Sequence, residues 1–517
     1  MKHIKKLASL LLALVMALSL AVTAFADEST TYSITINNST AGHTYEAYQI
    51  FTGDLATNEA GNKVLSNIVW GSGVSEAGQT ALGDAAAKTE TLKTEADAKA
   101  FAKAVAPYLT TAAGSANTVT DGKYVISGLA AGYYLVKDQD GSLTGDNDSY
   151  TEYIIQVVGN VTATPKSDVP EVQKKVKDIN DSTDTTKTDW QDSADYDIGD
   201  SIPFQLKATL ADNVSSYTTY KVVFHDTLSK GLTYNNDAKV YIDGTETNGF
   251  TVTATVNADG TTTLTVSCDD VKALGAGNSS VITVEYTAKL NENAVLGSAG
   301  NPNEVYLEYS NNLNKSEEGN NETGETPKDV VIVFTYKTII NKVDSENAPL
   351  TGAAFKLEKL IKGEDGAADT WTTIKEFAVD GTTTSFTFSG LDDGQYKLTE
   401  TKTPAGYNTI DPIYFVIEAT HDATADTPAL TVLKAYLTDE NGNKKTEVKD
   451  GETVNIDLGT VDLTAGSITT TVVNKSGSKL PSTGGIGTTI FYVLGGVLVL
   501  AAVVLLVTKK RMSGAEK

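Results

Sequence analysis

Hydrophobic and polar residues alternate along most of the chain, in short runs separated by glycine, asparagine and aspartate. Residues 31–36 read TYSITI and residues 202–210 read IPFQLKATL, and each run places apolar side chains at alternate positions. A period of two is typical of strands that bury one face of a sheet, and threonine, valine and tyrosine favour strands. The pattern predicts an all-β protein made of tandem β-sandwich domains.

One stretch departs from this alternation. Residues 75–108 are rich in alanine, lysine, glutamate and threonine, and the segment AKAFAKAVAPYL at their end, residues 98–109, has helical character. We therefore expect one or two helices inserted between strands of the first domain.

Apolar runs stand near both ends of the chain. The first 26 residues carry three lysines, a run rich in leucine and alanine, and an A-x-A sequence, which predicts a signal peptide that is cleaved after Ala26. Residues 490–507 are mostly apolar and long enough to cross a membrane as a helix. The cations at 509–511 favour a cytoplasmic end for that span. We expect an exported chain that its C-terminal segment holds briefly in the membrane.

Turn residues and prolines divide the chain into segments. The connector TPKSDVP, at residues 164–170, has two prolines and no apolar run, which predicts a short extended link. The expected segments are a signal peptide (1–26), an N-terminal domain (27–165), a linker (166–170), a middle domain (171–329), a C-terminal domain (330–476) and a C-terminal tail with the apolar span (477–517).

The composition of the chain excludes several classes of function and of site. The formal net charge of −25 repels nucleic acid, so we exclude nucleic-acid binding. A single cysteine, Cys268, rules out an intramolecular disulfide, and its setting in TLTVSCDD is that of a small packed residue rather than a nucleophile. The four histidines form no cluster with cysteine, so we assign no metal ligands and expect no cofactor.

A pentapeptide precedes the apolar span near the C-terminus: Leu480, Pro481, Ser482, Thr483 and Gly484. With the span and the basic tail after it, this pentapeptide resembles the LPxTG cell-wall sorting signal that Gram-positive sortases cleave between threonine and glycine. The resemblance implies that Thr483 becomes joined to an amine and that the protein is displayed on the cell wall.

The C-terminal domain contains PLTGAAFKL at residues 349–357 and YKLTETKTPAGY at residues 396–407. The second stretch resembles the E-box of collagen-adhesin B-type domains. Together with the sorting signal and the opening YEAYQIFTGDL, it makes the chain similar to the backbone pilins of sortase-assembled fimbriae. This resemblance implies immunoglobulin-like sandwiches of the collagen-adhesin type and a role as a structural shaft subunit that supports adhesion.

The resemblance also implies isopeptide bonds inside domains, in which a lysine amine attacks an asparagine side chain and ammonia leaves. Burial lowers the pKa of a lysine and raises that of an acid, so the amine becomes a nucleophile and the acid a proton donor. In the C-terminal domain the matching residues are Lys342, Asn474 and the catalytic acid Glu400.

The middle domain resembles the collagen-adhesin A-type arrangement, which uses an aspartate as the acid. The matching residues are Lys174, Asn303 and Asp226. Three neighbours remain open as alternatives: Lys175, Lys177 and Asn301. In the first domain GYYLVKD has lysine where an E-box has glutamate, so we assign no cross-link there.

A further lysine is implied for the links between subunits. Backbone pilins use a lysine near the boundary of their first two domains, and here Lys166 directly follows Pro165 in ATPKSD. Lys174 and Lys175 are the alternatives.

The implied partners follow from this chemistry. A pilin-class sortase would join Thr483 to the lysine of another copy, and a housekeeping sortase would join the finished polymer to peptidoglycan. Minor pilins and host surface ligands are further expected partners. The alternative function is a monomeric, wall-anchored adhesin for host matrix or glycans. We expect no enzyme, because G-x-S-x-G, H-E-x-x-H and a phosphate loop are missing from the sequence.

Overall fold

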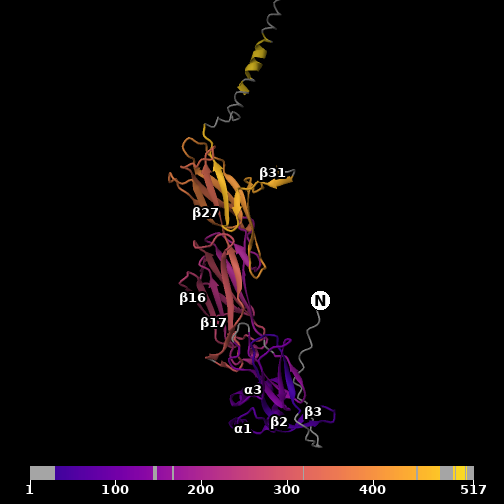
Figure 1. Ribbon diagram of the computed structural model, residues 1–517. Helices are drawn as coiled ribbons and strands as arrows, with labels where there is room; N and C mark the ends of the chain where they lie inside the picture. Colours follow the sequence, from indigo (N-terminus) through magenta and orange to yellow (C-terminus); the bar gives the residue numbers. More distant parts are fainter. Residues whose placement is uncertain are drawn as a thin grey trace, which may run out of the picture.

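The structure is a computed structural model that describes residues 30–143, 148–165, 168–317, 319–449, 452–477, 493–494, 497–506 and 508. Three β-rich domains follow one another along an elongated molecule (Figure 1). Some of the predicted sites lie outside the described residues: Ala26 with the signal peptide, Lys166, and the pentapeptide at residues 480–484.

The N-terminal domain packs two sheets and a layer of helices; the helices lie between strands as the sequence predicts, but there are three α-helices in its described residues rather than one or two. One core lies between the sheets, and a second lies between the larger sheet and the helices, where Phe51 stacks on Phe101. Ser75, Asp84 and Thr94 each cap a helix by accepting a backbone N–H, which explains where the three helices begin.

The strand orders of this domain are β5–β1–β8 and β3–β2–β6–β7, with β4 beside β2. Its elements are β1 (Tyr32–Asn37), β2 (Tyr45–Thr57), β3 (Lys63–Trp70), α1 (Glu76–Leu82), α2 (Ala85–Thr91), α3 (Glu95–Val105), η1 (Ala106–Tyr108), β4 (Gly114–Ala116), β5 (Lys123–Leu129), β6 (Gly132–Asp138), β7 (Glu152–Val157) and β8 (Val161–Ala163).

The middle domain is a sandwich of two sheets. Their orders are β10–β23–β19–β12–β17–β16, with β22 beside β19, and β15–β14–β18–β11–β9, with β13 beside β18. Buried and less buried residues alternate along β11 and β18, so one face of each strand lines a core that Val, Leu, Tyr and Phe side chains fill.

The elements of the middle domain are β9 (Glu171–Val176), β10 (Ser193–Asp195), β11 (Ser201–Thr209), η2 (Val214–Ser216), β12 (Val222–Leu228), β13 (Leu232–Tyr234), β14 (Lys239–Ile242), β15 (Thr245–Thr247), β16 (Thr251–Val256), β17 (Thr262–Cys268), η3 (Val271–Leu274), β18 (Val281–Leu290), β19 (Asn301–Ser310), β20 (Ser316–Glu317), β21 (Asn320–Asn321), β22 (Thr323–Glu325) and β23 (Asp329–Phe334).

The boundary between the middle and C-terminal domains lies later in the chain than the sequence predicts, because of strand β23. The expected C-terminal domain begins at residue 330, but β23 pairs with β19 and β10 of the middle domain. The pairing therefore places the change of domain after Phe334. Sequence alone predicts one strand over VIVFTYKTIINKV, residues 331–343, because no turn residue separates β23 from the next strand.

The C-terminal domain is a second sandwich, with sheets ordered β27–β24–β34–β33 and β26–β25–β28–β29–β30. The hairpin β31–β32 projects from its side (Figure 1). Its elements are β24 (Tyr336–Val343), β25 (Ala354–Ile361), η4 (Glu364–Gly366), β26 (Thr370–Glu376), β27 (Ser385–Leu391), β28 (Gly394–Lys402), β29 (Ile413–His421), β30 (Leu430–Thr438), β31 (Thr446–Lys449), β32 (Glu452–Asn455), β33 (Thr460–Asp462) and β34 (Ser467–Val473).

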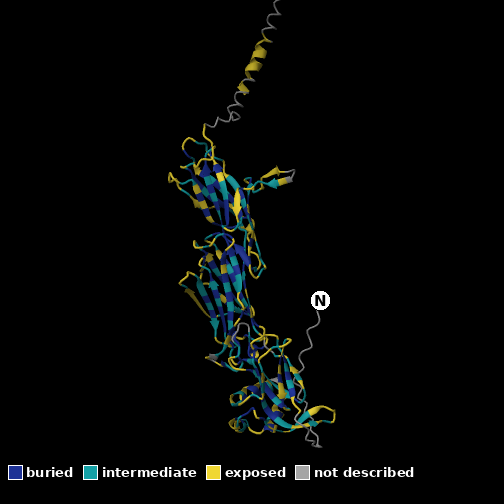
Figure 2. Ribbon diagram, viewed as in Figure 1, coloured by how far each residue is buried: buried dark blue, intermediate teal, exposed yellow. Residues whose placement is uncertain are grey.

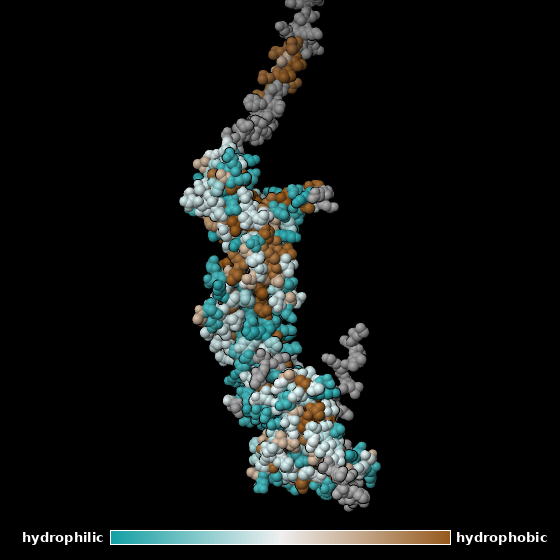
Figure 3. All heavy atoms as spheres, in the orientation of Figure 1, coloured by the Kyte–Doolittle hydropathy of each residue, from teal (hydrophilic) through white to brown (hydrophobic). Residues whose placement is uncertain are grey.

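Figure 2 shows buried positions running along the inside of each sandwich, with exposed residues gathered on loops and edges. Beyond the C-terminal domain, residues 497–506 are helical and apolar and appear as a hydrophobic run in Figure 3. In the described part of the chain, no helix is long and apolar enough to span a membrane. The predicted span at residues 490–507 lies partly outside that part.

Candidate cross-linking sites

Lys174, Asp226 and Asn303 meet inside the middle sandwich. Lys174 lies on β9 at the edge of one sheet, whereas Asp226 and Asn303 lie on the adjacent strands β12 and β19 of the other. All three side chains are fully buried. The Nζ atom of Lys174 is 2.5 Å from Oδ1 of Asp226. The fold thus brings together the three residues that the sequence analysis selected.

Burial changes the protonation chemistry of this pair. Desolvation lowers the pKa of Lys174, against the attraction of Asp226. Desolvation likewise raises the pKa of Asp226, against the attraction of Lys174. The Phe204 ring lies 5.5 Å from Nζ and adds to the apolar surroundings. Both shifts favour a neutral amine beside a neutral carboxylic acid, which is the form that nucleophilic attack on an amide requires.

Tyr286 on β18 is a fourth member of this cluster, and the sequence analysis missed it. Its Oη atom accepts hydrogen bonds from Lys174 Nζ (3.1 Å) and Asn303 Nδ2 (2.8 Å), and it donates one to Asp226 Oδ2 (2.5 Å). Alternation in SVITVEYTAKL predicts that Tyr286 points inward. It does not predict which side chains the hydroxyl meets, because those come from three other strands.

The carbonyl oxygen of Asn303 is buried, and within the described residues it has no hydrogen-bond partner. Buried carbonyl groups in folded proteins nearly always accept a hydrogen bond, so a buried carbonyl without one is unusual. Attack by the amine of Lys174 would use this carbonyl group as its electrophile, which would give the unpaired oxygen a chemical role.

The alternatives left open by the sequence are engaged elsewhere. Lys175 forms an ion pair with Asp192, and Lys177 lies over the ring of Trp190 at 4.9 Å. Asn301 is buried but has both ends of its amide bonded, with Oδ1 accepting from the N–H of Val295 and Nδ2 donating to two backbone carbonyls. The geometry therefore favours Lys174 and Asn303 over these neighbours.

The C-terminal domain holds a second cluster of the same kind. Lys342 lies on β24 and Asn474 follows β34, and these two strands are parallel neighbours. Glu400 lies on β28 in the opposite sheet. Asn474 Nδ2 donates to both carboxylate oxygens of Glu400, at 2.9 and 3.1 Å, and to the backbone carbonyl of Asn408 at 3.0 Å. Here the acid contacts the asparagine directly.

Lys342 is fully buried beside this acid. Desolvation lowers its pKa, against the charges of Glu400 and Asp344. Its Nζ donates to the backbone carbonyls of Val343 (2.8 Å) and Val472 (3.2 Å). The Oδ1 atom of Asn474 repeats the feature of the middle domain, since it is buried and, in the residues described, unpaired.

The first domain has a different cluster at the corresponding strand. Lys137 forms an ion pair with Asp140 at 2.9 Å, while buried Asp138 binds His43 at 2.7 Å. Burial alone would lower the pKa of His43, but Asp138 and Asp148 raise it to about 9. In the described residues these contacts are ion pairs: Lys137 is held by Asp140, His43 lies between Asp138 and Asp148, and no contact joins Lys137 to an asparagine amide.

A third buried lysine, Lys359, lies in a different electrostatic environment from Lys174 and Lys342. Nζ of Lys359 is surrounded by Asp181 (2.5 Å), Asp197 (2.8 Å) and Asp392, at the junction of the middle and C-terminal domains. Burial would lower the pKa of Lys359, but the three carboxylates raise it well above its ordinary value. Unlike Lys174, this amine stays charged. The three aspartates have the spacing of metal ligands, yet their common position already holds this ammonium.

His421 occupies a similar place between two other aspartates of the junction. Its Nε2 lies 3.4 Å from Asp178 and 3.8 Å from Asp195, and the three side chains also have the spacing of metal ligands. Burial alone would lower the pKa of His421, but the two carboxylates raise it to about 10. The protonated ring of His421 thus supplies the positive charge that a metal ion would bring to these two carboxylates.

We expect this histidine to make the junction sensitive to alkaline pH. Because the folded-state pKa of about 10 exceeds the ordinary 6.5, the stabilisation by His421 is complete below about pH 6.5 and is lost as pH rises through 10. The melting temperature of the C-terminal domain, measured by calorimetry, should fall between pH 7 and pH 10. The fall should be smaller in His421→Asn, and an equal fall in that variant would contradict the assignment.

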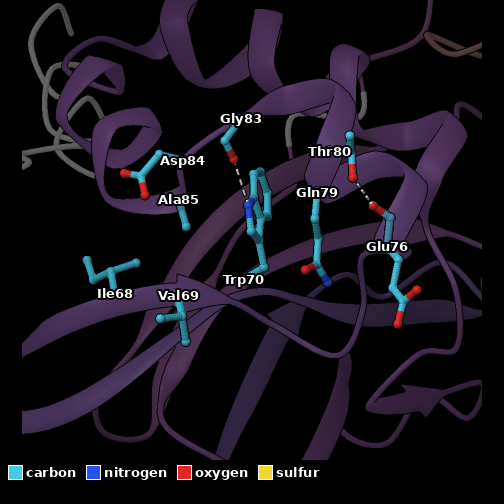
Figure 4. Close-up of a pocket in the computed structure, with 9 residues that line it drawn as sticks. All are labelled: Ile68, Val69, Trp70, Glu76, Gln79, Thr80, Gly83, Asp84 and Ala85. Carbon is cyan, nitrogen blue, oxygen red and sulfur yellow. Dashed lines mark hydrogen bonds between the residues drawn. The ribbon is translucent and has the colours of Figure 1, made fainter.

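A surface pocket of about 440 Å³ lies in the first domain, between β3 and the first two helices (Figure 4). Trp70 is one of the residues that line it, with Nε1 donating to the carbonyl of Gly83 at 2.8 Å. Its two acidic residues, Glu76 and Asp84, are exposed to solvent. The pocket holds none of the side chains of the two clusters.

Three family models match the chain. The Gram-positive pilin backbone subunit 2, Cna-B-like domain matches residues 198–313, the prealbumin-like fold domain matches residues 337–429, and the LPXTG cell wall anchor motif matches residues 472–513. The first two models match parts of the sandwiches that hold the two clusters, and Lys174 and Asn474 lie outside the residues that these two models match. The chain is a Gram-positive backbone pilin. The description of its middle domain names the Cna-B type, whereas the sequence suggested an A-type arrangement.

The chain is also similar to several proteins over most of its length. The pilin is 26% identical over 460 residues to the trypsin-resistant surface T6 protein of Streptococcus pyogenes serotype M6, covering 76% of this chain and 77% of that one. The structure of the T6 backbone pilin matches with a TM-score of 0.54 at 19% identity, over 87% of this chain and all of the other. The major pilin SpaD of Corynebacterium diphtheriae matches with a TM-score of 0.48 at 18% identity, over 88% of this chain and all of that one.

The pilin is therefore a structural protein, the shaft subunit of a pilus that is anchored to the cell wall and displayed at the surface. Sortase-mediated polymerisation and attachment follow from the backbone family and the anchor motif. These findings favour the shaft subunit over the monomeric adhesin and confirm the all-β class predicted from the alternation of residues.

Proposed function

We propose that the pilin makes two isopeptide bonds within itself, one in each of its last two domains. The bonds join Lys174 to Asn303 with Asp226 as the acid, and Lys342 to Asn474 with Glu400 as the acid. One observation carries the proposal. In both domains a fully buried lysine of lowered pKa, an acid and an asparagine with an unpaired carbonyl oxygen converge from separate strands.

The chemistry that this arrangement supports is a single turnover in each molecule. The neutral lysine amine attacks the side-chain carbonyl carbon of the asparagine, and the acid provides the proton with which ammonia leaves. Folding brings the groups together and replaces a bimolecular encounter by an intramolecular one. The product is a neutral amide, which removes the cost of keeping an ionisable lysine in the core.

The link between subunits is proposed on a different basis. A pilin-class sortase would hold Thr483 as a thioester, the amine of Lys166 in another copy would attack it, and a housekeeping sortase would attach the polymer to peptidoglycan. The exclusion of the alternatives supports Lys166. Lys174 is fully buried, and Lys175 is paired with Asp192, so neither offers a free amine at the surface. The polymer would also carry minor pilins and would support adhesion to host surfaces.

Intact mass tests the internal bonds. The processed chain should weigh about 34 Da less than the sum of its residues, because each bond expels one ammonia of about 17 Da. Asp226→Asn should restore one ammonia and leave the other bond in place, since the two clusters lie in separate cores. Tryptic peptides should contain Lys174 branched to Asn303. A mass equal to the residue sum would remove both bonds from the proposal.

A further inference from the structure

We infer that the hydroxyl of Tyr286 is a catalytic group of the middle-domain reaction, carrying a proton from Asp226 to the nitrogen that leaves Asn303. The inference rests on the proposed Lys174–Asn303 bond. In the part of the chain that the structure describes, Asp226 makes no hydrogen bond to the side-chain nitrogen of Asn303, so Tyr286 would deliver the proton that this nitrogen needs to leave.

The hydrogen bonds of the cluster define a path for the proton. Asp226 uses its two oxygens differently, with Oδ1 facing Lys174 Nζ at 2.5 Å and Oδ2 accepting from Tyr286 at 2.5 Å. The same Oη lies 2.8 Å from Asn303 Nδ2. In the described residues no hydrogen bond joins Asp226 to Asn303, so the phenol is the connection between the acid and the amide.

The C-terminal domain shows why a bridge is needed. There Glu400 reaches Asn474 Nδ2 with both oxygens, at 2.9 and 3.1 Å, and no intervening group stands between them. Aspartate is one methylene shorter than glutamate. In the middle domain the phenol of Tyr286 spans the missing length, so Asp226 and Tyr286 together occupy the role that Glu400 has alone.

The steps balance in protons and electrons. Lys174 gives one proton to Asp226 Oδ1, which leaves an amine and a carboxylic acid. The amine lone pair forms a bond to Cγ of Asn303, and the electrons of the carbonyl double bond move to Oδ1. The Asp226 carboxyl group turns its protonated oxygen toward Tyr286, and the nitrogen of the tetrahedral intermediate turns its lone pair toward Oη. Asp226 then passes its proton to Oη while Tyr286 passes its own to Nδ2. The C–N bond breaks, ammonia leaves, the carbonyl reforms, and the new amide nitrogen returns its extra proton to Asp226.

The surroundings hold Tyr286 in position for this transfer. Its ring stacks on Phe204 at 5.5 Å and meets the edge of Tyr234 at 5.6 Å. Desolvation raises its pKa well above the ordinary value, so it remains a phenol with a proton to donate. At 3% exposure, it leaves a solvent molecule little access to take over the relay.

Tyr286→Phe in the full chain tests the inference, because it removes one oxygen and keeps the ring. After pulse-labelled expression, the fraction of chain with the branched Lys174–Asn303 peptide is followed by mass spectrometry. We expect bond formation to slow on the order of 10²-fold, the usual contribution of a positioned acid–base group. The Lys342–Asn474 bond in the same molecules should form at the wild-type rate.

Tyr234→Phe is the matched control, since within the described residues its hydroxyl makes one hydrogen bond, accepted from the N–H of Ala238 in the same core. It should leave both bonds unchanged. In a second variant, Asp226→Glu added to Tyr286→Phe lengthens the acid by one methylene and should recover part of the lost rate, which a purely structural phenol would not permit. Bond formation is scored in the monodisperse folded fraction from size exclusion.

The outcomes separate the two proposals. A wild-type chain without the branched Lys174–Asn303 peptide would refute the proposed bond itself. A wild-type chain with it, and a folded Tyr286→Phe chain that forms it equally fast, would overturn only the role of Tyr286. A slow middle domain beside a normal C-terminal domain supports both.

Discussion

Replacing Lys166 with alanine is expected to abolish the ladder of high-mass bands that a covalent pilus gives after boiling in detergent. The sequence places this lysine after Pro165, at the connector between the first two domains, where backbone pilins present the amine that joins subunits. With one cysteine the chain has no disulfide network to replace that amide. Immunoblots of wall extracts should show the variant only at the mass of the single subunit.

Lys175→Ala is the control for this experiment. Its amine pairs with Asp192 and lies on β9, so its removal should leave the ladder intact. Mass spectrometry of the polymer released from the wall should find Thr483 joined to Lys166. A ladder that persists in Lys166→Ala, with Thr483 joined to another lysine, would exclude the assignment.

The general architecture could be predicted because it depends on local patterns. Alternation along β11 and β18 predicts strands with one buried face, and the alanine-rich segment before residue 108 predicts helices. The E-box supplied Glu400, and the resemblance to pilins then narrowed the search for its lysine and asparagine. These inferences need only periodicity and motifs, both of which are written along the chain.

The remaining details depend on contacts between distant segments. Tyr286 and Asp226 are far apart in sequence and meet because β18 and β12 face each other across the sandwich. The junction cluster joins Asp181 to Lys359 from the next domain. Strand β23 belongs to the middle sandwich through its pairing with β19. No periodicity encodes such partners, so sequence alone could not supply them.

The buried lysines illustrate how the environment decides chemistry. Lys359 meets three carboxylates, which hold its proton and raise its pKa. Lys174 meets one carboxylate and aromatic rings, and burial lowers its pKa. The same residue type is therefore a fixed cation at the domain junction and a candidate nucleophile in the core. Charge balance around each amine, rather than burial alone, separates the two roles.

Glu400→Gln is expected to cause the largest loss of stability within a domain. The Lys342–Asn474 bond would close a loop of roughly 130 residues, and a covalent closure of that size contributes about 4–5 kcal/mol by restricting the unfolded chain. Without the acid the bond does not form, so calorimetry should show the C-terminal domain melting on the order of 10–20 °C lower. Intact mass should rise by about one ammonia, roughly 17 Da.

Glu358→Gln provides the matched comparison in the same sandwich. Glu358 is also largely buried and pairs with Lys356 and Lys397, at 3.0 and 2.8 Å, without touching the reactive cluster. This variant should keep the missing mass and lose far less stability. If Glu400→Gln kept the missing ammonia, the acid would have no role in bond formation. If it regained the mass but melted as the wild type does, the bond would form without stabilising the fold, and its purpose would have to lie in resistance to pulling force along the shaft.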